Sequence, residues 1–184
     1  MPRLFTGLEI PAGIATELTL LRGGVAGARW IEPSDFHLTL RFVGDVGNAL
    51  ANEIAFELEH VKSAPVRVSL ERLATFGTDR PRSLIARAKE SAALMALQAE
   101  HEAIMRRLGA PGDARKFVPH VTLARLKNVS AEAVAAFIES RGDMRPMSFD
   151  AARFVLYSSK DSTGGGPYRI EVAYPLDDVR RARG

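Results

Sequence analysis

The sequence predicts an α+β fold of two pseudo-symmetric lobes, each an antiparallel sheet with helices on the outside. Three observations lead to this prediction. A His-x-Thr-Leu motif occurs twice, beginning at His37 and at His120. Each copy lies in a run of alternating polar and apolar residues, which is typical of a strand with one buried face. The order strand, helix, motif strand, helix, strand surrounds both copies, which indicates an internal duplication.

Apolar residues at helical spacing predict four helices, which begin near Pro11, Gly47, Ser91 and Ser130. Ser91 and Ser130 are expected to cap their helices. The glycine run 164–166 lies between the last two strands and is interpreted as a flexible hairpin, because it lacks the spacing of a phosphate-binding loop. The expected strands cover residues 3–10, 28–31, 36–44, 66–76, 83–88, 116–126, 148–158 and 168–174.

Length and composition fit one globular domain. The chain has 184 residues, 46% of them hydrophobic, which is enough for a core. The absence of cysteine excludes disulfides, thiolate metal sites and a cysteine nucleophile. We expect a single domain over residues 1–184, with the boundary between its two repeats near residues 77–82.

The charge and hydropathy of the chain limit its partners only loosely. No apolar run approaches membrane-spanning length and no signal peptide is visible, so we expect a cytoplasmic protein without a membrane partner. A net charge of +3 and a pI near 9.5 permit binding to RNA but do not demand it.

The two motif strands carry the candidate catalytic residues. Alternation places His37 and Thr39 on one face of the first strand, and His120 and Thr122 on one face of the second. If the halves fold alike, these faces meet across one cleft and both imidazoles point at one ligand. Histidine can act as acid or base near neutral pH, so the repetition predicts paired acid–base catalysis. The threonine hydroxyls lie one strand period from their histidines and are within reach of the same ligand.

Further segments accompany the two motifs in order along nearly the whole chain. They are Arg3-Leu4-Phe5, Leu8-Glu9-Ile10-Pro11, Arg29-Trp30, Phe36 to Gly44, Phe117 to Arg125, and Phe154 with Leu156-Tyr157-Ser158-Ser159. This set resembles the 2H phosphoesterase superfamily, and within it the bacterial and archaeal RNA 2′,3′-cyclic phosphodiesterases, also called 2′-5′ RNA ligases.

The resemblance implies an activity and assigns roles. It implies opening of a 2′,3′-cyclic phosphate on RNA to a 2′-phosphomonoester, and a reversible 2′-5′ joining of RNA ends. His37 would donate a proton to the 3′ oxygen and His120 would accept one from water, while the hydroxyls of Thr39 and Thr122 would bind the non-bridging phosphate oxygens. Neither a metal nor another cofactor is expected. The expected partner is RNA with a 2′,3′-cyclic phosphate end, tRNA fragments among the candidates, and the protein is expected to be a monomer.

Two arginines compete for the role of phosphate-binding cation. Alternation nominates Arg41, which shares a face with His37, although a surface or ion-pair role for Arg41 is equally compatible. The resemblance nominates Arg125, which strict alternation places on the face opposite His120, so that its use requires a local twist or a bulge. We favour Arg125, and predict that Arg125→Ala lowers turnover far more than Arg41→Ala.

Three alternatives remain open at this stage. The chain could bind RNA ends without turnover, or act on another cyclic or 2′-5′-linked nucleotide. A metal site on His37 and His120 is a weaker alternative, because no carboxylate or thiol stands at ligand spacing. The other histidines, His60 and His101, are interpreted as structural or surface residues, and Trp30 as a core residue.

Overall fold

The computed structural model describes residues 3–112, 115–142, 144–159 and 166–177. Its helices are α1 (Ala12–Thr19), α2 (Asn48–Leu58), α3 (Ala92–Arg107), α4 (Ala131–Arg141) and a 3-10 turn, η1 (Pro33–Asp35). Its strands are β1 (Arg3–Glu9), β2 (Ala28–Trp30), β3 (His37–Asp45), β4 (Val66–Phe76), β5 (Ser83–Ala88), β6 (His120–Leu126), β7 (Met147–Ala151), β8 (Arg153–Ser159) and β9 (Tyr168–Pro175).

The nine strands form one sheet in the order β7-β4-β5-β6-β3-β1-β8-β9, with β2 added beside β6. All of these pairings are antiparallel. The two motif strands, β3 and β6, meet at the centre of this order and share the single pair Leu38–Val121. The predicted α+β fold of two antiparallel lobes is thus confirmed, with the two sheets joined where the motif strands meet.

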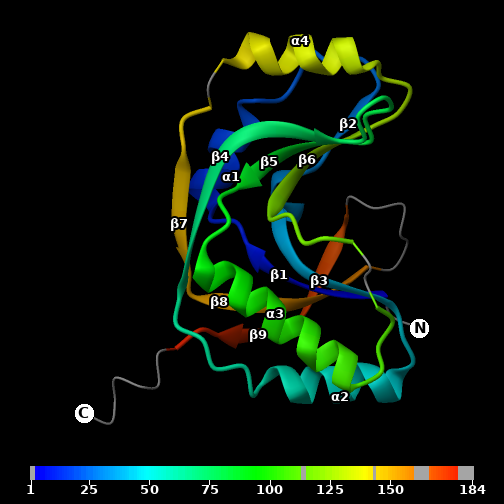
Figure 1. The fold of residues 1–184 in the computed structure, drawn as a ribbon, viewed down its shortest axis with the longest axis vertical. Coiled ribbons are helices and arrows are strands. Elements are labelled where there is room, and N and C mark those ends of the chain that lie inside the picture. Colours follow the sequence, from blue (N-terminus) through cyan, green and yellow to red (C-terminus); the bar gives the residue numbers. More distant parts are fainter. Residues whose placement is uncertain (1–2, 113–114, 143, 160–165, 178–184) are drawn as a thin grey trace.

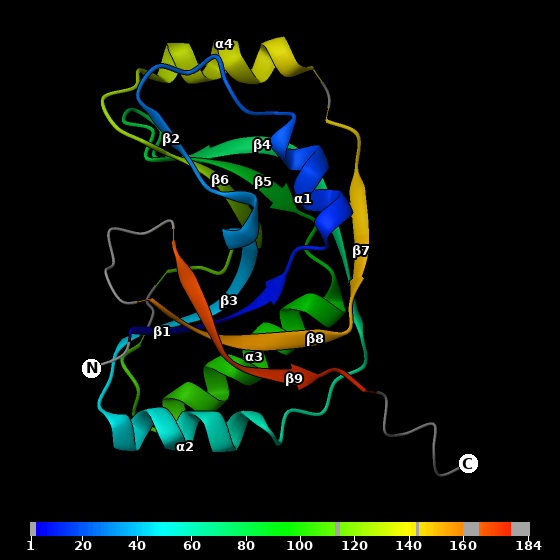
Figure 2. The same ribbon diagram turned by 180° about the vertical axis from the view of Figure 1, so that it is seen from behind.

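The lobes lie at opposite ends of the molecule, with α4 beyond β4, β5 and β6 and with α2 and α3 beside β1, β8 and β9 (Figure 1; Figure 2). Each lobe combines strands from both halves of the chain. The hairpin β4–β5 joins β6 and β7 in one lobe, while in the other β8 returns to pair with β1 and β9 pairs with β8. Residues 77–82 form the β4–β5 connection. That the repeats divide there stays a prediction.

The helix caps are as expected. The Ser91 hydroxyl accepts the backbone N–H of Leu94 at 3.2 Å, and the Ser130 hydroxyl accepts that of Ala133 at 3.1 Å. Both contacts satisfy N–H groups that a helix cannot pair within itself. None of the helices in the described part of the chain has the length and apolarity needed to cross a bilayer.

Two expected strands differ from the observed ones by more than a single residue at an end. The strand expected over 148–158 is divided at Ala152, because β7 pairs with β4 at one edge of the sheet and β8 pairs with β1 near the other. The second motif strand begins at His120 and not at 116; the residue before it, Pro119, has no N–H to donate to a ladder. Of the glycine run, only Gly166 lies within the described residues.

Candidate active site

The central strand pair fixes the direction of the motif side chains. Leu38 and Val121 are fully buried, so the residues on either side of each point to the opposite face of the sheet. Those residues are half-buried and line a cleft of about 720 Å³. The structure therefore brings together four residues that the sequence singled out, namely His37, Thr39, His120 and Thr122.

Both imidazoles are held in the same way. The Nδ1–H of His37 donates to the backbone carbonyl of Asp35 at 2.8 Å, and that of His120 donates to the carbonyl of Val118 at 2.6 Å. A carbonyl can only accept, so Nδ1 carries the hydrogen in each ring. The lone pair of each neutral imidazole is therefore on Nε2, and Nε2 is the atom left to exchange protons with a ligand.

The surroundings disfavour the charged form of both rings. Burial is the main cause that lowers the pKa of His37 to about 4, and repulsion from His120 and Arg125 adds to it. Burial also lowers the pKa of His120, with repulsion from Arg125 and Arg115 as further causes. The bonds to the Asp35 and Val118 carbonyls oppose these shifts. An anion bound between the rings would favour their protonation, as a phosphate does.

Aromatic rings pack against each imidazole. Phe5 lies 4.8 Å from His37 between ring centroids, and Tyr168 meets it edge-on at 4.9 Å. Phe76 meets His120 edge-on at 4.7 Å. These contacts restrict rotation of the two rings. No specific signal in the sequence points to Tyr168, which lies far from both motifs, whereas Phe76 stands at the end of an alternating strand.

Bulges in both motif strands change which arginine faces the cleft. Leu40 is an extra residue in β3 opposite β1, and Leu123 is an extra residue in β6 opposite β5. Each bulge reverses the alternation that follows it. Arg125 is brought to the face of His120 by this reversal and lines the cleft, as the sequence argument required. The same reversal turns Arg41 inward.

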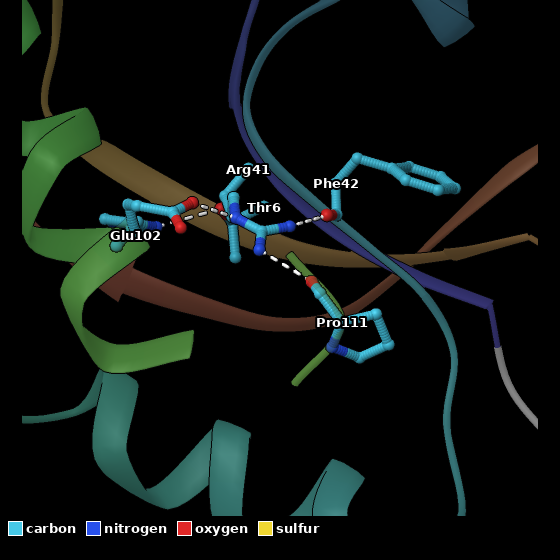
Figure 3. A network of polar contacts seen from close by, with 6 residues as sticks. Thr6, Arg41, Phe42, Glu102 and Pro111 are labelled. Atoms are coloured by element: carbon cyan, nitrogen blue, oxygen red, sulfur yellow. Dashed lines mark hydrogen bonds and ion pairs between the residues drawn. The ribbon is translucent and has the colours of Figure 1, made fainter. Parts of the chain in front are cut away.

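The placement of Arg41 from strict alternation is therefore wrong. Its side chain is 2% exposed and forms an ion pair with Glu102 of α3 (Figure 3). The guanidinium also donates to the carbonyls of Phe42 and, at 2.7 Å, Pro111. Although Arg41 borders the cleft, it joins β3 to α3 and to the segment that follows α3. The ion-pair interpretation, not the phosphate-binding one, agrees with these contacts.

Arg125 has the opposite character. Its side chain is half-buried in the cleft, and its Nε–H is buried without a hydrogen-bond partner in the described part of the chain. A buried donor without a partner costs about 1–3 kcal/mol, which an anionic ligand in the cleft would recover. Other cations line the same cleft, namely Arg82, Arg115 and Lys116.

The remaining histidines and the tryptophan lie outside this cleft. His101 is fully buried, contacts the hydroxyl of Thr6 at 2.8 Å and packs edge-on against Phe154. His60 is exposed near the end of α2. Trp30 packs against the core and against Phe137, as expected. Within residues 3–112, 115–142, 144–159 and 166–177, no three His, Cys, Asp or Glu side chains gather as a metal site would require.

A duplicated α+β fold with paired His-x-Thr strands has the features of a 2H phosphoesterase. The family described as LigT like Phosphoesterase matches the chain twice, over residues 8–86 and 85–168. The chain therefore belongs to the LigT-like phosphoesterase family.

Relatives agree with this assignment, and solved structures share the fold. A protein of Aeropyrum pernix, named RNA 2′,3′-cyclic phosphodiesterase, is 30% identical over 142 residues, 76% of this chain and 81% of its own. One of Aquifex aeolicus with the same name is 29% identical over 156 residues, 80% of this chain and 81% of its own. A structure from Thermus thermophilus has a TM-score of 0.77 at 24% identity, covering 95% of this chain and 97% of its own. The structure of Escherichia coli LigT complexed with 3′-AMP has a TM-score of 0.74 at 20% sequence identity. The match covers 96% of this chain and 99% of that chain.

Proposed function

We propose that this protein is an RNA 2′,3′-cyclic phosphodiesterase that opens the cyclic phosphate to a 2′-phosphomonoester. The observation that carries the proposal is the pair of imidazoles, each with Nδ1 bonded to the backbone carbonyl two residues before it and with Nε2 left for a ligand in one cleft. The names of the relatives support the substrate class. RNA, tRNA fragments among the candidates, is the partner we propose, with the protein acting as a monomer in the cytoplasm.

The reaction needs one neutral imidazole and one protonated imidazole. Nε2 of neutral His120 accepts a proton from water as the water oxygen bonds to phosphorus. The bond between phosphorus and the 3′ oxygen breaks, and Nε2 of protonated His37 gives its proton to that oxygen. The phosphate remains on the 2′ oxygen. We assign the two roles in this order from the family resemblance, since the two rings are held alike.

Three further groups would stabilise the charge on the phosphate. The hydroxyls of Thr39 and Thr122 flank the central strand pair on the face of the histidines, and the Nε–H of Arg125 has no partner of its own in the described part of the chain. We propose that all three donate to the non-bridging oxygens, where charge grows in the transition state. A 5′-hydroxyl in place of water would open the cyclic phosphate to a 2′-5′ linkage by the same step, with the proton again passing from the nucleophile to His120 and from His37 to the 3′ oxygen. Attack of the freed 3′-hydroxyl on that linkage reverses the step, which accounts for reversible joining.

The test uses an RNA with a 2′,3′-cyclic phosphate end, in chelator, with the wild type, His37→Ala and His120→Ala. We expect the wild type to form a 2′-phosphate, and each variant to be slower by about 10²–10⁴-fold. A 3′-phosphate product would reverse the assignment of the leaving oxygen. Binding of the RNA end without turnover would favour the non-catalytic alternative. Turnover of other cyclic or 2′-5′-linked nucleotides, without turnover of the RNA end, would favour a phosphodiesterase for another substrate. Loss of activity in chelator would point to a metal.

A further inference from the structure

Asp35 and Tyr168 form a wall between two cavities. Both residues line the cleft that contains the histidines, and both line a neighbouring groove of about 420 Å³. Asp35 ends η1 just before the first motif strand, whereas Tyr168 begins β9, the strand at one edge of the sheet. A contact between two residues 133 positions apart in the chain therefore closes one side of the cleft.

Asp35 holds His37 from two directions. Its backbone carbonyl accepts the Nδ1–H of His37 at 2.8 Å. Its carboxylate Oδ1 accepts the backbone N–H of Tyr168 at 3.0 Å, and the Tyr168 ring then meets the imidazole edge-on at 4.9 Å with an interplanar angle of 83°. One residue thus supports the His37 ring both directly and through its aromatic neighbour.

The segment before β9 is fitted closely to the same carboxylate. Gly166 has a φ of +87°, and a Cβ at this position would lie 2.1 Å from Oδ2 of Asp35. No side chain larger than hydrogen fits without displacing the carboxylate or the segment. The backbone at Gly166 and the N–H of Tyr168 therefore both pack against Asp35.

The second lobe holds its aromatic ring differently. Val118 stands where Asp35 stands, two residues before the histidine, and its side chain is apolar. Phe76, the ring on His120, is fixed by strand pairing, since it pairs with Ser83 and its carbonyl accepts the N–H of Arg82 at 2.8 Å. Tyr168 is the first residue of an edge strand, and this strand, β9, pairs with β8. The bond to the Asp35 carboxylate attaches the start of β9 to η1 as well.

We propose that Asp35 is a positioning residue for the reaction: it fastens the start of β9 to η1 and so keeps Tyr168 against His37. The proposal rests on the proposed function. Because Asp35 acts on the orientation of the donor ring, its loss lowers kcat more than it raises KM. A misplaced catalytic group can cost about 10²-fold in rate, which sets the upper limit of the effect.

The test compares Asp35→Ala with Asp35→Asn, and uses Ser34→Ala of the same turn as control. We expect Asp35→Ala to lower kcat about tenfold or more with KM changed less than about threefold. Asparagine keeps an oxygen for the Tyr168 N–H, so Asp35→Asn should regain most of the lost kcat. A kcat for Asp35→Ala equal to that of Ser34→Ala, or no rescue by asparagine, would overturn the proposal.

Gly166→Ala adds an independent test by a double-mutant cycle. Its Cβ meets the carboxylate of Asp35, so it should lower kcat in the wild type and less so in Asp35→Ala. If Gly166→Ala lowered kcat by the same factor in the wild type and in Asp35→Ala, the contact with the carboxylate would not be the cause of the loss.

Hydrogen exchange of the Tyr168 amide separates this proposal from the proposed function. The amide donates to Asp35 and should exchange about tenfold faster in Asp35→Ala, whether or not the protein turns over RNA. Equal exchange in the wild type and Asp35→Ala would overturn the attachment itself. If the wild type lacks activity while the exchange rates differ, the function fails and the attachment stands.

Discussion

Arg125 in β6 holds the strand position that Phe42 holds in β3. Each residue stands five positions after the motif histidine, just beyond a bulge, and each faces the cleft from its half-buried position. Their partners on the neighbouring strands also differ in polarity. Phe42 pairs with the aromatic Phe5, whereas Arg125 pairs with the polar Ser83. The duplicated fold therefore presents an aromatic side and a cationic side to one ligand.

The cationic side predicts a large effect for Arg125→Ala. Loss of one donor to a developing oxyanion costs about 10²–10³ in rate, and we expect a decrease in kcat/KM of that order. Arg125→Lys should recover part of it, because lysine restores the charge but not the geometry of the guanidinium. Steady-state kinetics on an RNA with a cyclic phosphate end provide the measurement.

Arg72→Ala is the matched control for Arg125→Ala. It removes the same charge from an exposed position on β4 that does not line the cleft. If both variants lost the same small factor, Arg125 would have no specific contact with the phosphate.

Strand periodicity predicted the cleft-facing histidines and threonines but could not predict both arginines. The alternation from His37 to Phe42 is perfect in the sequence, so it gives no sign of the bulge at Leu40. In β6 a sign exists: Leu126 is out of phase with Val121 and Leu123, as a bulge between them would require. The ion pair between Arg41 and Glu102 joins residues 61 positions apart, and no local pattern encodes it.

The contacts of Arg41 predict a loss of stability for Arg41→Ala. The variant removes the cation from Glu102 and leaves the Pro111 carbonyl without its donor. Because Glu102 is 32% exposed and regains some hydration, we expect a decrease of about 2 kcal/mol in the free energy of unfolding, less than for a fully buried pair. Urea unfolding measures this decrease, and turnover per folded molecule should fall far less than in Arg125→Ala.

The exposed pair between Arg67 and Asp150, at 3.0 Å, provides the control for this measurement. Arg67→Ala should change the free energy of unfolding by less than about 0.5 kcal/mol, since exposed ion pairs contribute little. Equal stability of Arg41→Ala and Arg67→Ala would show that the buried contacts of Arg41 are not needed for the fold.

If the two motif histidines act as proposed, their lowered pKa values predict an acidic optimum for kcat/KM. This constant reports the free enzyme, in which the pKa of His37 is about 4 and that of His120 lies below 6.5. Because both pKa values lie below 6.5, both rings are mostly neutral above that pH, and the fraction of molecules with one protonated and one neutral ring decreases as pH rises. We therefore expect kcat/KM to fall as pH rises above about 6.5, by about tenfold per pH unit.

The same measurement distinguishes the bound enzyme from the free one. The phosphate of the substrate favours the imidazolium form, so the alkaline limb of kcat should lie at higher pH than that of kcat/KM. A kcat/KM that stays level between about pH 6 and pH 8 would mean that the free protein already holds the proton of the donor ring near neutral pH. Circular dichroism at each pH checks that the protein remains folded.

His101 predicts a separate dependence of stability on pH. Burial lowers its pKa to about 3 in the folded protein, against 6.5 for an exposed histidine. Between these values the unfolded chain binds the proton and the folded protein does not, so stability falls as pH falls through this window. Near pH 5 the loss from this one group is about 2 kcal/mol.

His101→Leu removes this dependence while keeping an apolar side chain in the core. We expect the variant to be less stable than the wild type near pH 8, because the Thr6 hydroxyl loses its partner, yet to lose less stability between about pH 8 and pH 5. Leu97→Ala, at a buried position of the same helix without a titrating group, should keep the slope of the wild type. Urea unfolding at about pH 8, 6.5 and 5 gives the three curves. If the curve of His101→Leu ran parallel to that of the wild type, His101 would have to be protonated within the folded core.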